Sequence, residues 1–343
     1  YGLNASWTIY NGSKRLNTIK QERLNNQVAN LDVETSENSI QESIAQIYIQ
    51  ILYAAESVKV NENTLQVSIA QRDRGQELLN AGSIAKSDFA QLEAQVSTDR
   101  YQLVTAQATL QDYKLQLKQL LELDGENEMN IYLPVLSDEN VLLPLPAKKD
   151  VYMSALTLRP EIEASKINVE ASELGIDIAK AGYLPTISLS AGIGTNHTSG
   201  SDFTFGEQVK NGWNNSIGVS VSVPIFNNRQ TKSAVQKAKL QRETSLLSLL
   251  DEQKTLYKTI EGLWLDANSA QQRYAAANEK LKSTQISYDL ISEQFDLGMK
   301  NTVELLTEKN NLLQAQQEQL QAKYMAILNT QLLKFYQGDK LAL

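Results

Sequence analysis

The chain has 343 residues, of which 42% are hydrophobic and 7% aromatic, and its net charge is −8 at pH 7. This acidic balance argues against a nucleic-acid-binding protein, because contacts to phosphate need clustered Lys and Arg. The lack of cysteine excludes disulfides and thiolate metal sites. The only histidine, His197, lies in a polar loop, which leaves no histidine-based triad and no multi-histidine metal site. We therefore expect neither an enzyme nor a cofactor.

The composition favours long helices. Ala, Gln, Leu, Glu and Lys are abundant and proline occurs only 6 times, as in coiled-coil proteins. No run of 18 apolar residues is present, so we expect no transmembrane helix. The first residues already resemble a strand, and we expect the chain to begin partway through its fold.

The first predicted element is a strand over residues 2–10. Residues of two kinds alternate along it, with one face made by Leu3, Ala5, Trp7 and Ile9 and the other by Gly2, Asn4, Ser6 and Thr8. A period of two with different faces is typical of a strand.

Residues 13–123 predict a helical hairpin with its turn near residues 80–88. No proline interrupts residues 13–79, and apolar residues recur there three, four or seven positions apart. Such a stripe indicates a seam packed against partner helices. A helix of this length would measure on the order of 100 Å, and Gly82 permits the turn that follows it.

An irregular connector and a shorter helix are expected after this hairpin. Residues 124–150 contain three of the six prolines and carry no periodic pattern. A helix is expected over residues 160–182, with Pro160 in the first turn, where its missing N–H is not needed.

Two further strands are expected at residues 184–194 and 216–226. Both alternate apolar residues with Ser, Thr, Gly or Asn, and neither face carries a charge. Their length suits a tilted strand that crosses a bilayer, and an apolar outside with a small polar inside is typical of outer-membrane barrels. A half-buried sheet of a soluble protein is the alternative.

Three or four strands cannot close a barrel alone, because about eight are needed, so the barrel would be shared among subunits. The residues expected to face lipid are Leu3, Trp7, Ile9, Ile187, Leu189, Ile193, Ile217, Val219, Val221, Val223 and Ile225.

A second helical hairpin is expected over residues 229–337, with its turn near residues 296–304. Sliding the sequence along itself by one constant shift places Gly82 on Gly298 and the first strand on the third one. We therefore expect two structural repeats, residues 1–123 and 151–343.

Together these features resemble the TolC family of outer-membrane efflux ducts. The resemblance rests on LRPEIEASKINVEASELGIDIAKAGYLPTISLSAGIG at residues 158–194 and on two turns, AGSIAKSDF at 81–89 and LGMKNTVEL at 297–305. It implies a mainly helical protein with a small β part, in which three subunits give four strands each to one twelve-stranded barrel. Long coiled-coil hairpins would form a tunnel below it. By the shift that relates the two repeats, the fourth strand would precede residue 1.

The resemblance also implies a function. The protein would be the exit duct of a tripartite export system in the outer membrane of a Gram-negative bacterium, with its tunnel in the periplasm. It would conduct drugs, other small molecules or secreted protein passively. The implied partners are two further copies, outer-membrane lipid, a periplasmic adaptor and an inner-membrane transporter of the RND, ABC or MFS type. The implied docking tips are Gly82, Ser83, Ile84, Ala85, Gly298, Met299, Lys300 and Asn301.

A gate at the periplasmic tip is implied as well. Glu304 stands at the first of two acidic positions in the family's constriction, and Thr307 stands at the second, with Glu308 beside it. Three copies of Glu304 would make an acidic ring that favours cations.

Two links between hairpins would hold the gate closed. They correspond to Phe295 with Asp88 and to Lys300 with Ser87. Because Phe295 has no hydroxyl group, the first link would not be a hydrogen bond.

The alternative function is that of a structural protein or periplasmic adaptor that bridges a pump to another duct. Long heptad hairpins alone would fit that role. The uncharged strands favour the duct, because the soluble barrel of an adaptor would place charges in water.

Overall fold

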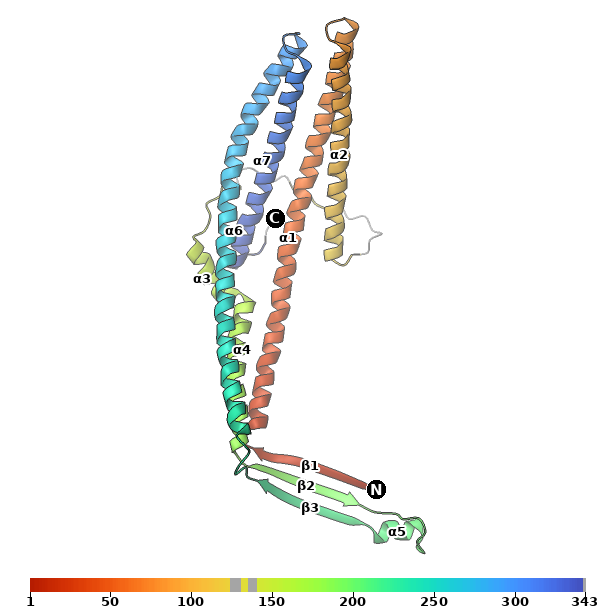
Figure 1. Cartoon of the computed structure of the whole chain (residues 1–343), viewed down its shortest axis with the longest axis vertical. Coiled ribbons are helices and arrows are strands. Elements are labelled where there is room, and N and C mark those ends of the chain that lie inside the picture. The colour runs from red at the N-terminus through yellow and green to blue at the C-terminus, as the bar shows by residue number, and fades with distance from the viewer. Residues whose placement is uncertain (124–130, 135–140, 342–343) are drawn as a thin grey trace. The chain divides into compact units, whose positions relative to one another are not determined.

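A computed structural model describes residues 1–123, 131–134 and 141–341. The expected class is confirmed, since the protein is mainly helical and has one small sheet (Figure 1). The expected connector at residues 124–150 lies in part outside the described residues.

The chain divides into two compact units. The first joins Tyr1–Thr35 with Arg159–Lys254, and the second joins Ser36–Leu158 with Thr255–Leu343. Two helices of 67 residues each contribute to both units, namely α1 (Lys14–Asn80) and α6 (Gln230–Asp296).

The sheet belongs to the first unit. Its strands are β1 (Gly2–Asn11), β2 (Thr186–Gly194) and β3 (Asn214–Ser222), and they lie side by side in that order (Figure 1). Both pairs are antiparallel. β1 and β3 therefore form the two edges of the sheet within the described residues.

The strand register separates apolar from small polar side chains. Trp7, Leu189 and Val219 lie opposite one another in one row, and Ser6 and Ser190 face each other in the next. Side chains in one row share a face of the sheet. The apolar face is exposed in this chain, with Trp7 at 65% and Val219 at 66%.

β1 contains an irregularity that alternation alone does not reveal. The register shifts between Thr8 and Tyr10, so that Tyr10 lies opposite Ile187. A bulge of this kind inserts one residue into a strand. Tyr10 therefore takes the place in the apolar row that the alternation assigned to Ile9.

β3 begins and ends earlier than expected. The sequence predicted residues 216–226, but the strand ends at Ser222. Pro224 has no N–H to give to a neighbouring strand, which explains why pairing stops before it. Val223 and Ile225 lie beyond the strand and are exposed, at 61% and 96%.

The junction between β1 and α1 and the junction between β3 and α6 share the same backbone conformation. Gly12 and Ser13 both have a φ of 65°, and Asn228 and Arg229 have φ values of 49° and 62°. The shift that relates the two predicted repeats carries the first pair onto the second. Two successive left-handed residues are rare outside glycine, so the two junctions share an unusual turn.

Helices of the first unit pack beside α4 (Pro160–Lys180) and the short helix η2 (Ala181–Tyr183). The Gln21 amide of α1 donates to the Ala171 carbonyl at 2.8 Å. Arg242 of α6 pairs with Glu173 of α4 at 2.7 Å. Pro160 occupies the first turn of α4, where no helical N–H is lost.

The second unit contains two helical hairpins (Figure 1). α1 turns back into α2 (Lys86–Leu120), and α6 turns back into α7 (Thr302–Gln337). Their core is built from Ala, Leu, Ile and Tyr side chains, among them Ala45, Ile49, Leu52, Ala270, Tyr274, Ala326 and Leu332. Alanines allow the helix axes to approach closely. Within the described ranges, no helix has both the length and the apolar composition that crossing a membrane requires.

Two short helices were not predicted, α3 (Lys148–Leu158) and α5 (Phe205–Asn211). α5 lies in the loop between β2 and β3, and its first turn is closed by Thr204 and Glu207, whose hydroxyl and carboxylate are 2.8 Å apart.

The segment before α3, residues 141–147, is held against α6 in the second unit by side-chain hydrogen bonds. The Trp264 indole donates to the Pro146 carbonyl at 3.0 Å, and the Gln271 amide donates to the Leu143 carbonyl at 2.8 Å. Lys148 pairs with Glu261 at 2.7 Å and lies over the Trp264 ring. Side chains of α6 therefore hold residues 143–148 of the connector.

Candidate functional site at the helical tips

The two hairpin tips have the same backbone turn. Gly82 and Gly298 both have a φ of 74°. The Ser83 N–H donates to the Leu78 carbonyl at 2.8 Å, and the Met299 N–H does the same to Gln294 at 2.8 Å. This bond, with a left-handed glycine before it, is the Schellman ending of a helix. Only glycine adopts that conformation without strain.

The returning helices also begin alike. The backbone N–H of Ala85 donates to the Asp88 carboxylate at 3.3 Å, and that of Asn301 donates to the Glu304 carboxylate at 3.2 Å. The Asn301 side chain accepts from the Glu304 N–H in return. An acidic residue at this place satisfies a free N–H of the first turn and favours the positive end of the helix.

Glu304 has a second partner that Asp88 lacks among the described contacts. The Lys300 ammonium donates to Glu304 Oε1 at 2.6 Å. This bond, together with the one from Asn301, lowers the pKa of the Glu304 carboxyl below its ordinary value. Glu304 is thus ionised at neutral pH, and its charge is balanced by Lys300, which lies in the tip just before α7 begins.

The other predicted gate residues lie in local contacts. Thr307 donates to the Val303 carbonyl at 2.7 Å, and Glu308 accepts from Ser287 of α6 at 3.1 Å. Phe295 is buried, at 3% exposure.

The residues of the two links expected between the hairpins make other contacts in this chain. Lys300 donates to Glu304, and the Asp88 carboxylate accepts from the backbone N–H of Ala85 at the start of its own helix. In the described part of this chain, Lys300 forms no hydrogen bond with Ser87. Both links therefore stay predictions about the assembled protein.

A buried polar cluster below the tips was missed. Ser68 of α1, Asp99 of α2 and Lys309 of α7 are exposed by 2%, 2% and 3%. The Lys309 ammonium donates to Asp99 and to Ser68, and the Ser68 hydroxyl donates to Asp99. We call these three residues the buried triad.

The second oxygen of the Asp99 carboxylate is also satisfied. The Gln95 amide donates to Asp99 Oδ1 at 2.9 Å. Burial lowers the pKa of the Lys309 ammonium below its ordinary value, and the bond to Asp99 opposes that shift.

The sequence carried a signal for this triad. Asp99 follows Leu92 and Val96 on the apolar stripe of α2, and Lys309 lies between Leu305 and Leu312 on that of α7. A charge on an apolar stripe predicts burial with a partner. The signal is easily overlooked in helices that carry many exposed charges.

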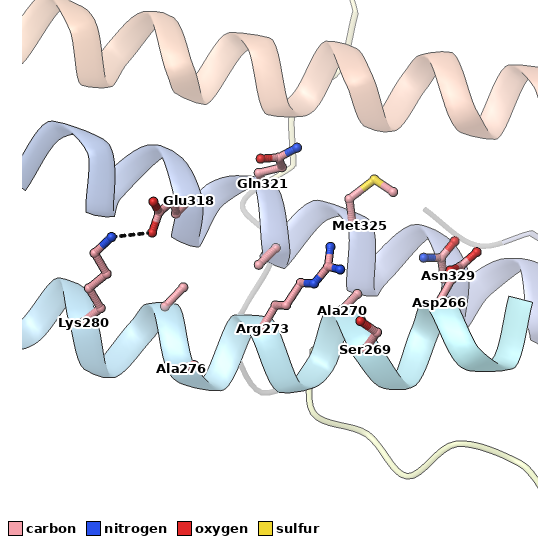
Figure 2. Close-up of a pocket in the computed structure, with 12 residues that line it drawn as sticks. Asp266, Ser269, Ala270, Arg273, Ala276, Lys280, Glu318, Gln321, Met325 and Asn329 are labelled. Carbon is pink, nitrogen blue, oxygen red and sulfur yellow. Dashed lines mark hydrogen bonds and ion pairs between the residues drawn. The ribbon is translucent and has the colours of Figure 1, made fainter.

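A groove of about 550 Å³ runs between α6 and α7 farther from the tips (Figure 2). Its lining combines alanines such as Ala270 and Ala276 with charged residues, and the Lys280–Glu318 pair, at 2.7 Å, spans it from helix to helix. Nowhere in the described residues do three or more His, Asp or Glu side chains gather as a metal site would need.

Known proteins match this chain along most of its length. It is 25% identical over 85% of its residues to the outer membrane efflux protein BepC of Brucella suis, and 23% identical over 95% to the outer membrane protein TolC of Escherichia coli. The chain spans 61% and 66% of the lengths of these relatives.

Solved structures show the same fold. The crystal structure of the Campylobacter jejuni CmeC outer membrane channel superimposes with a TM-score of 0.81, at 19% identity, over 100% of this chain and 72% of that one.

The sequence profile of outer membrane efflux proteins matches residues 151–338, more than half of the 343 residues. The resemblance to the TolC family is therefore confirmed, and with it the location in the outer membrane of a Gram-negative bacterium. The chain belongs to the outer membrane efflux protein family.

Proposed function

We propose that the protein is the exit duct of a tripartite export system and conducts its cargo passively, without catalysis. The observation that carries this proposal is the sheet of the first unit. None of its three strands contains a charged residue, and one face is apolar and exposed. Exposure of such a face to water is unfavourable in free energy, whereas lipid would cover it.

The free edges of the sheet support a shared barrel. β1 and β3 each have one side without a partner in the described part of the chain. In lipid an open edge would leave backbone N–H and C=O groups unsatisfied. A homotrimer that closes a twelve-stranded barrel, with one strand per subunit in addition to β1, β2 and β3, would remove every edge, and its lumen would be lined by the Ser and Gly face.

Two observations support the proposed pair of structural repeats, residues 1–123 and 151–343. The left-handed residues at the two junctions and the glycine turns at the two tips are related by one and the same shift along the sequence. In this arrangement each repeat supplies one hairpin of the tunnel and at least one strand of the barrel.

The tips are the proposed docking surface for a periplasmic adaptor and, through it, for an inner-membrane transporter. The proposed gate lies at the start of α7, where Glu304 and Lys300 would line the narrow end of the tunnel. A lumen lined by small polar groups offers little selectivity, so drugs, other small molecules and secreted protein all remain candidate cargo.

The proposed sheet orientation can be tested with two neighbouring residues of β3. Val219→Lys would place a charge on the lipid face, which costs about 2–4 kcal/mol near the middle of a bilayer. Ser220→Lys places the same charge on the opposite face. We expect Val219→Lys to reduce the yield of trimer in isolated outer membranes strongly, and Ser220→Lys to leave it near the parent level.

Equal losses in the two variants would contradict this orientation. A parent protein that stays monomeric and soluble without detergent would contradict the duct itself and would favour the periplasmic adaptor.

A further inference from the structure

The buried triad joins the two hairpins at a point that the proposed gate does not include. Ser68 and Asp99 belong to the α1–α2 hairpin, and Lys309 belongs to α7. Lys309 lies five residues after Glu304, roughly 7 Å along the helix. A charge-assisted contact therefore crosses between the hairpins about one and a half turns from the gate.

Other polar contacts between the hairpins are uncharged or more exposed than the buried triad. The Gln71 amide of α1 donates to the Tyr288 hydroxyl of α6 at 2.8 Å, a half-buried bond between neutral groups. Arg74 of α1 lies 3.9 Å from Asp296 of α6, with side chains exposed by 45% and 57%. The Gln95 amide reaches Asn310 only at 3.4 Å. Exposed pairs contribute little because water and salt screen them.

The triad differs because its charges are out of water. Removing one partner of a buried pair leaves the other charge buried and uncompensated, which is strongly unfavourable. A small movement of α7 away from α1 and α2 would likewise separate the buried charges, and this stays unfavourable until water enters and hydrates them. Two arrangements of the hairpins are therefore favoured, the paired one without water that is observed and a separated one in which water covers both charges.

We propose that Ser68, Asp99 and Lys309 form a latch that holds α7 against the α1–α2 hairpin and must break before the hairpins separate. This inference deepens the proposed function, because it rests on the idea that the tip opens. It assigns the closed state mainly to this buried cluster rather than to contacts at the tip.

The test uses the absence of cysteine in the chain. Cysteines introduced for spin labels at the exposed positions Ser97 of α2 and Val303 of α7 report the separation of the hairpins in the purified protein. Lys309→Met keeps the length of the side chain and removes its charge. We expect the share of molecules with a widened shortest distance between labels to rise about tenfold or more.

The matched control is Lys280→Met. It removes the same group from an exposed ion pair within one hairpin, Lys280 with Glu318. We expect its distance distribution to equal that of the parent. Equal widening in both variants, or no widening in Lys309→Met, would overturn the latch.

A double variant keeps the test decisive if Lys309→Met folds poorly. Asp99→Leu combined with Lys309→Met replaces the ion pair by an apolar contact, which is often as stable as a buried pair. We expect the short distance to return. Persistent widening in a folded double variant would contradict the latch.

Conductance in planar bilayers separates the latch from the proposed function. Widening in Lys309→Met together with a larger conductance supports both. Widening with an unchanged conductance supports the latch and contradicts a gate at this tip.

Discussion

The two helical tips of this protein are alike in backbone and differ in side chains. Both turn through a left-handed glycine, and both place an acidic residue where it accepts from the first free N–H of the next helix. At the position that corresponds to Lys300, however, the first tip has Ile84. Only the second tip therefore adds an ion pair to its acidic cap.

This difference shows that an acidic residue at a tip by itself indicates a helix cap rather than a gate. Asp88 and Glu304 are both explained by the need to cap a helix, so an acidic residue here is not by itself the sign of a gate. The distinguishing features of the second hairpin are Lys300 and the buried Lys309, whose counterpart on the first hairpin is the exposed Glu93.

The largest expected effect on stability comes from the contrast between the buried Lys309 and the exposed Glu93. Lys309→Met should lower the free energy of unfolding of the helical hairpins by about 3–5 kcal/mol, because the Asp99 carboxylate stays buried without a positive charge to balance it. The measurement is denaturant unfolding followed by circular dichroism. Glu93→Met changes the equivalent position of the first hairpin and should alter stability by less than about 0.5 kcal/mol. Comparable losses would mean that burial of the triad has no energetic weight.

Glycine substitutions should affect the two tips equally. Gly82→Ala and Gly298→Ala each force a left-handed residue with a side chain, at a cost of about 1–2 kcal/mol. A methyl group would meet no atom within 4 Å at either position, so strain is the only contribution. Unfolding of the two variants should show matching shifts. Unequal shifts would indicate that one turn is held by contacts beyond its own hairpin.

The smallest expected effect is the difference between the two acidic caps, Glu304 of α7 and Asp88 of α2. Glu304→Gln loses the ion pair with Lys300 as well as the charged cap, whereas Asp88→Asn loses only a charged cap. Hydrogen exchange of the first-turn amides should therefore accelerate more in α7 for Glu304→Gln than in α2 for Asp88→Asn. The reverse order would show that Lys300 does not support Glu304 in solution.

The pH dependence of this cap has a defined sign. Folding lowers the pKa of the Glu304 carboxyl below its ordinary value of 4.5. Its stabilising contribution is therefore present above that ordinary value and is lost as the pH falls through the lowered one. Protection of the first turn of α7 should decline in that acidic range in the parent protein and stay flat in Glu304→Gln.

Much of this fold follows from the sequence because its signals are long. Apolar spacing sustained over tens of residues predicts long packed helices, and strict alternation predicts the strands. The short helices α3 and α5 were missed because 11 and 7 residues are too few to establish a period next to Pro, Ser and Gly. The bulge at Ile9 was missed because the sequence of one strand does not show its pairing register.

The candidate site was predictable only in part. The tip glycines could be placed from local pattern, since a turn depends on adjacent residues, whereas Glu304 was singled out only by the resemblance to the family. The ion pair of Lys300 with Glu304 joins residues four positions apart, whereas the buried triad depends on which residues of different helices lie side by side. Asp99 and Lys309 stand 210 residues apart, and only their positions on apolar stripes connect them in the sequence.

The central claim is that this protein is an outer-membrane duct whose narrow end lies at Glu304. Single-channel recording of the purified protein in a planar bilayer tests it most directly, by comparison of the parent with Glu304→Ala and Asp88→Ala. The account predicts conducting pores in all three, with cation preference and block by multivalent cations weakened in Glu304→Ala alone. Absence of pores in the parent, or an unchanged block in Glu304→Ala, would contradict it.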